Sequence, residues 1–317
     1  MSAIAPKDTS VNLAVNLGGL AMKNPVTTAS GTFAAGREYA DFVDVAALGA
    51  VTTKGVSLNG WEGNASPRIA ETPSGMLNSI GLQNPGVQHL ISYDLPWLAE
   101  QGAEAIVNVS GHSFDEYVAV IEALEEGAAS GRAPVGAYEI NVSCPNVDAG
   151  GMTMGCHGPS VERVVSACRA ATKRPLIVKL TPNVTDITEI ARAAESAGAD
   201  AISLINTLLG MAIDARRRAP VLARVVGGFS GPAVKPVALR CVWECHNAVK
   251  LPLLGMGGIT SGTDAVEFML AGATAVAVGT ANFMNPTATV DVIDGIIDYC
   301  EEQGVAHVNE LIGALEC

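Results

Sequence analysis

The stretch PLIVKLTPNVTDITEIARAAESAGADAISLI, residues 175–205, decides the fold. It holds two short apolar runs, at 175–180 and 199–205, and between them a helical pattern over 186–197 that Gly198 can end. Neither run alternates apolar with polar residues, which indicates strands that are covered on both faces. Strands of this kind with a helix between them predict a parallel sheet with helical crossovers.

The same alternation repeats along the chain. Six more apolar runs have the length of strand cores: 26–29, 50–53, 104–109, 135–142, 252–256 and 274–278. Helix-length segments lie between them, among them 114–128, 160–172, 235–249 and 263–271. This pattern of eight strands and intervening helices predicts one α/β domain over residues 1–317, a (β/α)8 TIM barrel. A doubly wound sheet is the alternative, but no GxGxxG follows the first strand.

The connections between these elements are of unequal length. The opening segment 11–24 predicts a short hairpin that caps the barrel floor. Long loops follow strands two, four and six, and those after strands two and six cover 54–90 and 206–235. Long loops in compact domains are usually functional, and these leave the strand ends at which barrel enzymes carry their sites.

Charge and composition exclude several classes of function. The net charge of −13 argues against a general nucleic-acid binder and against docking on anionic lipid. We expect no secretory signal, because the first residues lack a basic segment followed by an apolar one, and no membrane span, because no apolar run is long enough. The seven cysteines form no CxxC pair, so we expect no metal site and reduced thiols in a cytoplasmic protein.

Polar residues and glycines replace apolar ones just after nearly every predicted strand. They are Ser30, Lys54, Gly55, Asn108, Asn141, Lys179, Asn206, Thr207, Gly257, Gly258, Gly279 and Thr280. Each alone is also what an ordinary turn requires. Together they predict a polar mouth on an apolar barrel, which is the layout of a ligand site.

Two features of this mouth indicate an anionic ligand. Gly257–Gly258 and Gly279–Thr280 follow strands seven and eight, where barrel enzymes bind phosphate through backbone N–H groups, with tight turns as the alternative. Lys54 and Lys179 place ammonium groups at buried strand ends, where they need an anion. That anion is a ligand or, alternatively, an internal carboxylate.

Cys144 and several amides predict the chemistry. Cys144 precedes Pro145 at the mouth, and the glycine-rich stretch after it resembles a flap, so its thiol is a candidate nucleophile or base. A structural role is the alternative for any isolated cysteine. Four asparagines near the mouth suit a planar heterocycle with C=O and N–H edges, and they are Asn78, Asn108, Asn141 and Asn206.

A set of collinear motifs makes the chain resemble one family from about Leu13 onward. The motifs are ASG (29–31), TTKG (52–55), IAETPSGMLNSIGLQNPG (69–86), NVSG (108–111), INVSCPN (140–146), VKLTPNVTDI (178–187), INTLLGMAID (205–214), GGFSGPAVKPVALR (227–240), GMGGI (255–259) and AGATAVAVGTANF (271–283). In these motifs the chain resembles the catalytic subunits of the class 1B dihydroorotate dehydrogenases.

The resemblance implies an FMN-containing barrel that oxidises (S)-dihydroorotate to orotate in the de novo synthesis of pyrimidines (UMP), with Cys144 as the base. The implied FMN contacts are Ser30, Lys54, Gly55, Asn108, Asn141, Lys179, Ile205, Gly231, Gly257, Gly258, Gly279 and Thr280. The implied substrate contacts are Lys54, Asn78, Ser79, Ile80, Gly81, Leu82, Asn141, Asn206 and Thr207.

The resemblance also implies a partner. Class 1B enzymes pass electrons to NAD⁺ through a subunit with FAD and a 2Fe–2S cluster, in a heterotetramer of two catalytic and two electron-transfer subunits. The sequence leaves open a fumarate-dependent class 1A enzyme and a flavin barrel like dihydropyrimidine dehydrogenase. It also leaves open a flavin-free phosphosugar isomerase or lyase and a non-catalytic scaffold subunit.

Overall fold

Eight parallel strands form a nearly closed barrel at the centre of the computed structural model, which describes residues 3–131, 133–143 and 154–316. The strands are β3 (Val26–Thr28), β4 (Val51–Thr52), β7 (Ala105–Val109), β8 (Ala137–Asn141), β9 (Leu176–Lys179), β10 (Ala201–Leu204), β15 (Leu253–Met256) and β16 (Ala273–Val278). Their order is β3-β16-β15-β10-β9-β8-β7-β4. The predicted (β/α)8 barrel is confirmed, and each predicted strand lies within one or two residues of an observed one.

Side chains close the barrel between β3 and β4, which are the two ends of that order. Thr27 Oγ1 lies 3.1 Å from Thr52 Oγ1. The Thr52 backbone N–H donates to Thr28 Oγ1 at 3.0 Å. Hydrogen bonds of threonine hydroxyl groups thus join β3 to β4, whereas backbone hydrogen bonds join the other neighbouring strands.

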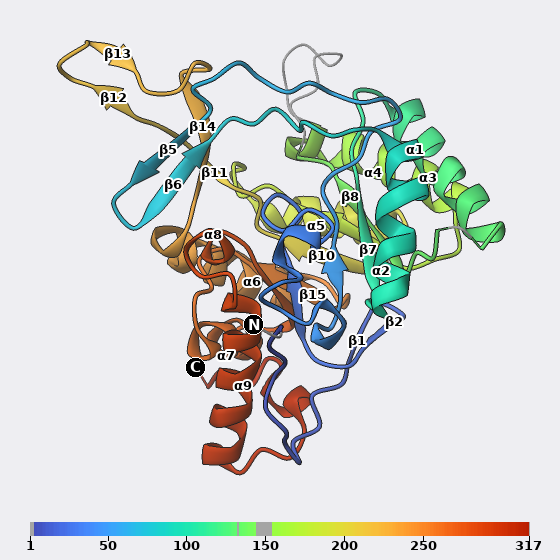
Figure 1. Cartoon of the computed structure of the whole chain (residues 1–317), viewed down its shortest axis with the longest axis vertical. Coiled ribbons are helices and arrows are strands. Elements are labelled where there is room, and N and C mark those ends of the chain that lie inside the picture. The colour runs from blue at the N-terminus through green and yellow to red at the C-terminus, as the bar shows by residue number, and fades with distance from the viewer. Residues whose placement is uncertain (1–2, 132, 144–153, 317) are drawn as a thin grey trace.

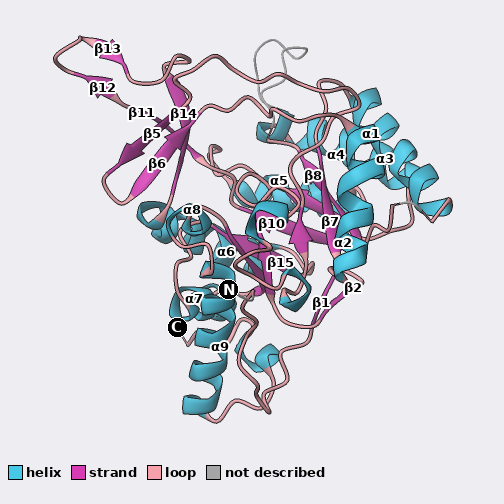
Figure 2. Ribbon diagram, in the orientation of Figure 1, coloured by secondary structure: helices cyan, strands magenta, loops and turns pink. Residues whose placement is uncertain are grey.

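Helices surround the barrel, as Figure 2 shows. They include α2 (Leu95–Gln101), α3 (Phe114–Ala129), α4 (Gly158–Ala171), α5 (Ile187–Ser196), α6 (Lys235–Ala248), α7 (Gly262–Leu270) and α9 (Ala288–Gln303). Asp186 caps α5 by accepting from the Thr188 N–H, and Ser261 and Asp264 form a capping box on α7. The core fills the barrel and the space between strands and helices, where large side chains such as Tyr138 and Phe268 have no exposed surface.

The predicted N-terminal hairpin covers the barrel floor. It consists of β1 (Val15–Leu17) and β2 (Leu20–Met22), joined by a turn at Gly18 and Gly19. A Cβ on Gly18 would lie 2.4 Å from the carbonyl oxygen of Asp200, the residue before β10. The hairpin therefore packs directly on the amino ends of the barrel strands, and glycine permits that approach.

The long connections after β4 and β10 are not irregular loops. They contain β5 (Ile69–Thr72), β6 (Gly75–Asn78), β11 (Leu208–Met211) and β14 (Val226–Ser230), which pair antiparallel in the order β11-β14-β6-β5. We call this four-stranded unit the mouth sheet. It stands apart from the barrel strands in Figure 1, and the small hairpin of β12 (Ile213–Asp214) and β13 (Ala219–Pro220) extends from it.

Candidate active site

A cavity of ≈ 490 Å³ lies at the carboxyl end of the barrel. Its wall combines residues that follow the barrel strands with residues from each strand of the mouth sheet, namely Ile69, Met76, Leu209 and Val226. The two long connections, far apart in the sequence, therefore build one wall of a single site.

The predicted site residues within the described ranges all line this cavity. They are Ser30, Lys54, Gly55, Asn78, Ser79, Ile80, Gly81, Leu82, Asn108, Asn141, Lys179, Ile205, Asn206, Thr207, Gly231, Gly257, Gly258, Gly279 and Thr280. Cys144, the predicted base, lies outside the described residues. Ser143, the residue before it, lines the cavity and donates through its hydroxyl to the Lys179 carbonyl at 3.3 Å.

A buried carboxylate lies behind the deep wall of the cavity. Glu139 on β8 has no exposed surface. Its Oε2 accepts a hydrogen bond from Asn108 Nδ2 and lies 3.7 Å from Lys179 Nζ. The internal ion pair considered for Lys179 is therefore present. Sequence reasoning missed Glu139, whose one signal is a charged residue within the apolar run YEINV.

Lys54, unlike Lys179, has no carboxylate partner among the described residues. It follows β4 and lines the cavity. Burial lowers the pKa of its ammonium group, and the nearby charges of Lys179 and Arg68 lower that pKa further. A half-buried cation without a partner is unfavourable in the empty protein, so Lys54 favours an anionic ligand.

Several polar atoms beside the cavity are buried and have no hydrogen-bond partner among the residues that the structure describes. They include Asn108 Oδ1, Ser79 Oγ and Ser110 Oγ. A Cβ on Gly55 would lie only 2.7 Å from that Asn108 oxygen. Buried polar atoms in native proteins are nearly always paired, so these unpaired atoms indicate that a ligand or water completes them.

One carboxylate, Asp264, holds the segment that follows the glycines Gly257 and Gly258 after β15. Asp264 Oδ2 accepts from the Thr260 N–H at 2.9 Å and from the Ser261 N–H at 3.0 Å, while Lys235 Nζ lies 2.6 Å from Asp264 Oδ1. Burial alone would raise the pKa of Asp264, but hydrogen bonds from Lys235 and Thr260 outweigh it and lower the pKa to about 2. Gly257 and Gly258 have φ of +123° and +84°, which favour glycine.

The asparagines of the mouth have different tasks. Asn206 Oδ1 accepts from the neighbouring Thr207 N–H at 2.8 Å, which is a local turn contact. Asn141 Oδ1 accepts from the Ser143 N–H at 3.3 Å, so within the described residues its amide nitrogen is left to donate. Asn183 was not predicted, yet it lines the cavity and donates to the Thr207 carbonyl at 3.0 Å.

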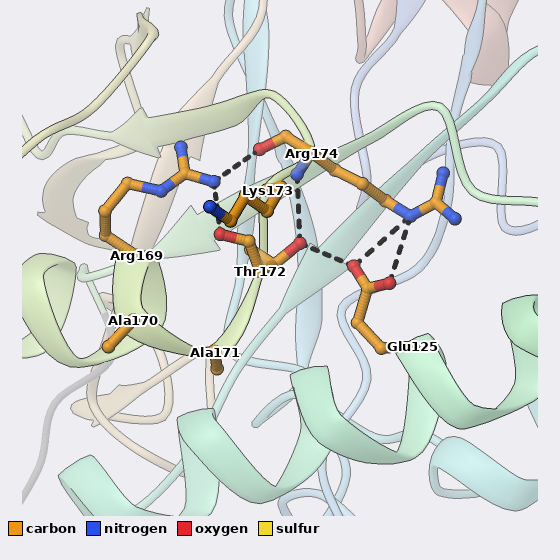
Figure 3. Close-up of a pocket in the computed structure, with 7 residues that line it drawn as sticks. All are labelled: Glu125, Arg169, Ala170, Ala171, Thr172, Lys173 and Arg174. Atoms are coloured by element: carbon orange, nitrogen blue, oxygen red, sulfur yellow. Dashed lines mark hydrogen bonds and ion pairs between the residues drawn. The ribbon is translucent and has the colours of Figure 1, made fainter.

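A second depression, of ≈ 720 Å³, lies at the opposite end of the barrel, around the start of β9. Figure 3 shows its polar side chains turned toward one another. Arg174 Nε lies 3.2 Å from Glu125 Oε1, and Arg169 Nη1 lies 2.7 Å from Asp200 Oδ2. Thr172 also donates to Glu125. These side chains already satisfy one another's hydrogen bonds and charges. We therefore assign them a structural role and call them the floor network.

No group of three or more His, Cys, Asp or Glu side chains within the described ranges could hold a metal ion. Across the same residues, no helix is both long and apolar enough to span a membrane.

Comparisons with known proteins agree with this geometry. The model of the family described as dihydroorotate dehydrogenase matches residues 12–299. A dihydroorotate dehydrogenase B (NAD(+)), catalytic subunit, from Alkaliphilus metalliredigens (strain QYMF) is 57% identical over 307 residues, 97% of this chain and 100% of that protein. Proteins of the same name from Bacteroides fragilis (strain YCH46) and Pelobacter propionicus are each 55% identical, over 96% of this chain and 99% of theirs.

Proposed function

The chain belongs to the dihydroorotate dehydrogenase family, and from this premise we propose that it is the NAD⁺-linked catalytic subunit that oxidises (S)-dihydroorotate to orotate. The reaction removes a proton from the carbon next to a ring carbonyl and a hydride from the adjacent carbon. One observation carries the proposal: the described residues that the family resemblance assigns to FMN and substrate all line one cavity.

The residues of this cavity fit FMN. The isoalloxazine ring of FMN presents N–H and C=O edges, and its ribityl chain ends in a phosphate. Within the described residues, the amide nitrogen of Asn141 is left to donate to a ring C=O, and Lys54 is a cation without a partner. The turns at Gly257–Gly258 and Gly279–Thr280 would hold the phosphate through their N–H groups. When bound, FMN supplies the acceptor for the hydride.

The chain's own residues would do the rest. Lys54 would bind the substrate carboxylate, and the segment from Asn78 to Leu82, which begins at the end of β6, would hold the substrate ring. Cys144 would take the proton as a thiolate, which is a reasonable general base near neutral pH. The mouth sheet contributes residues to the wall of the cavity and would restrict the access of water.

A separate electron-transfer subunit would complete the enzyme. The relatives are named catalytic subunits of NAD(+) enzymes, and that name implies a second subunit. We propose that this subunit carries FAD and a 2Fe–2S cluster and forms a heterotetramer with two copies of this chain. A single domain over residues 1–317 and a cytoplasmic location stay predictions of the sequence.

An anaerobic titration tests the proposal. The purified chain, loaded with FMN, should lose its flavin absorbance on stoichiometric addition of dihydroorotate and keep it on addition of dihydrouracil, which lacks the carboxylate. On its own the chain should make little NADH. Bleaching by dihydrouracil alone would move the assignment to a dihydropyrimidine dehydrogenase, and a chain that binds no FMN would favour the flavin-free reading.

A further inference from the structure

Glu139 is a buried charge that the proposed reaction does not use. It projects from β8 into the barrel and is not part of the cavity wall, but both side chains that it contacts are. Asn108 lies beside it on β7, in register with it, and Lys179 lies on β9. A buried carboxylate is costly unless its neighbours compensate it, so its position beneath two wall residues requires an explanation.

The carboxylate determines which way the Asn108 amide faces. An ionised carboxylate only accepts hydrogen bonds, so the group that Asn108 turns toward Glu139 must be its NH₂. The Asn108 oxygen is then directed away from Glu139 and lies against Gly55, buried and without a partner in the described chain. Glu139 therefore fixes the orientation of a fully buried amide that packs against Gly55, a residue of the cavity wall. With a donor in place of Glu139, this amide would be free to exchange the positions of its NH₂ and its oxygen.

The same carboxylate offsets one of two positive charges. Lys54 and Lys179 both line the cavity, and they are close enough to each other that the charge of Lys179 lowers the pKa of Lys54. With Glu139 ionised, the three groups sum to one positive charge. Without it the sum is two, in a region where Coulomb interactions are weakly screened because Glu139 and Lys179 are almost fully buried.

We propose that Glu139 is a positioning residue that sets the redox potential of the flavin, by compensating the charge of Lys179 and by fixing the direction of the Asn108 amide dipole beside the cavity. The inference rests on the proposed function, because it takes FMN as the ligand of the cavity. A reduced flavin carries more negative charge than an oxidised one, so a carboxylate behind the wall disfavours the reduced form. Glu139 thereby holds the flavin potential down, which favours the passage of electrons onward.

Glu139→Gln tests the proposal, because it removes the charge and keeps a side chain that can accept from Asn108. In the FMN-loaded chain, the midpoint potential is measured against reference dyes at about pH 8, where lysine is ordinarily charged and a reduced flavin is an anion. Reduced FMN should be favoured over oxidised FMN at least tenfold more than in the original chain, a rise of about 30 mV for a two-electron couple. Glu139→Asp keeps the charge and should restore most of the original potential.

Glu125→Gln is the matched control. It makes the same substitution in an ion-paired glutamate of the floor network, and it should leave the flavin potential unchanged. A purely structural role for Glu139 predicts lower stability with an unaltered potential, and that result overturns the proposal. Equal shifts in Glu139→Gln and Glu125→Gln overturn it as well, because the effect would then not be specific to the cavity.

A second pair of variants tests the proposal if the Glu139→Gln chain fails to fold. Lys179→Gln leaves the carboxylate uncompensated and should lower the potential, and adding Glu139→Gln to it should raise the potential again. If the double variant has the potential of Lys179→Gln, the proposal is wrong. Failure of the original chain to bind FMN contradicts the proposed function itself, and is distinct from FMN binding with an insensitive potential.

Discussion

The two ends of the barrel differ in whether their polar groups are paired with one another. At the floor, Arg169, Arg174, Glu125 and Thr172 bind one another and nearby carbonyl groups. At the mouth, Lys54 lacks a partner among the described residues, and the Asn108 oxygen is buried and unpaired. Unsatisfied polar groups therefore distinguish the site at the mouth from the structural network at the floor.

The largest expected effect concerns Cys144, the proposed base. Cys144→Ser should slow flavin reduction by dihydroorotate by about 10²-fold or more, because a serine hydroxyl is a much weaker base at neutral pH. FMN and orotate should still bind. Stopped-flow absorbance measures the rate. Cys156→Ser serves as the control, because it makes the same substitution at another free cysteine. Equal rates in the original chain and in Cys144→Ser would exclude the proposed role.

A glycine substitution tests whether the mouth turns need their backbone shape. Gly258→Ala places a Cβ 2.9 Å from the backbone nitrogen of Lys235 at a φ of +84°, so it should cost about 1–3 kcal/mol and weaken FMN binding. The control is Gly304→Ala, because Gly304 has a φ of +69° but open space around its Cβ. Chemical denaturation and FMN fluorescence titration measure the two effects. Unchanged FMN affinity in Gly258→Ala would argue against phosphate binding at this turn.

Replacing one cation at each end tests the comparison directly. Arg174→Met leaves Glu125 without its ion pair and the Val135 carbonyl without a donor, so it should destabilise the chain by about 1–2 kcal/mol and leave orotate binding intact. Lys54→Met removes a cation that has no partner in the described chain, so it should keep or raise the stability of the FMN-free protein and weaken orotate binding. If both variants lose stability equally, the two ends do not differ as described.

The smallest effect is a pH dependence. The pKa of Lys54 is lowered in the folded chain, mainly by burial, from 10.5. Between the lowered pKa and 10.5, the unfolded chain binds more protons, so stability should rise with pH over that window. The destabilisation is complete below the folded pKa and disappears above 10.5. Melting temperatures of the original chain and Lys54→Met should converge as the pH rises, and a constant difference would contradict this.

Local sequence signals were sufficient for the barrel. Apolar runs such as 175–180 and 199–205 mark strands covered on both faces, and glycines such as Gly198 mark helix ends, so the elements could be placed within a few residues. The same logic placed polar residues at the strand ends. It also located the cavity, because the carboxyl ends of parallel strands share one edge.

Contacts between distant segments could not be predicted in the same way. β6 and β14 pair through residues about 150 positions apart, and neither strand has a strong pattern of its own. Glu139 gave no sequence signal of its role, because that role depends on Asn108 and Lys179 arriving on neighbouring strands. The helical stretch before Gly102 was also missed, since a π-helical turn at Leu90–Asp94 and Pro96 interrupt its periodicity.

The pairing of β3 with β16 also determines when the barrel can close during synthesis of the chain. Val26 pairs with Val276, so the first barrel strand has no ladder until the ribosome has made nearly nine-tenths of the chain. At typical rates of translation, synthesis of the whole chain takes on the order of tens of seconds. Until Gly279 has been made, Ser30 and Lys54 cannot face it across a finished mouth. We therefore expect the nascent chain to bind its proposed cofactor only after residue 279 has left the ribosome.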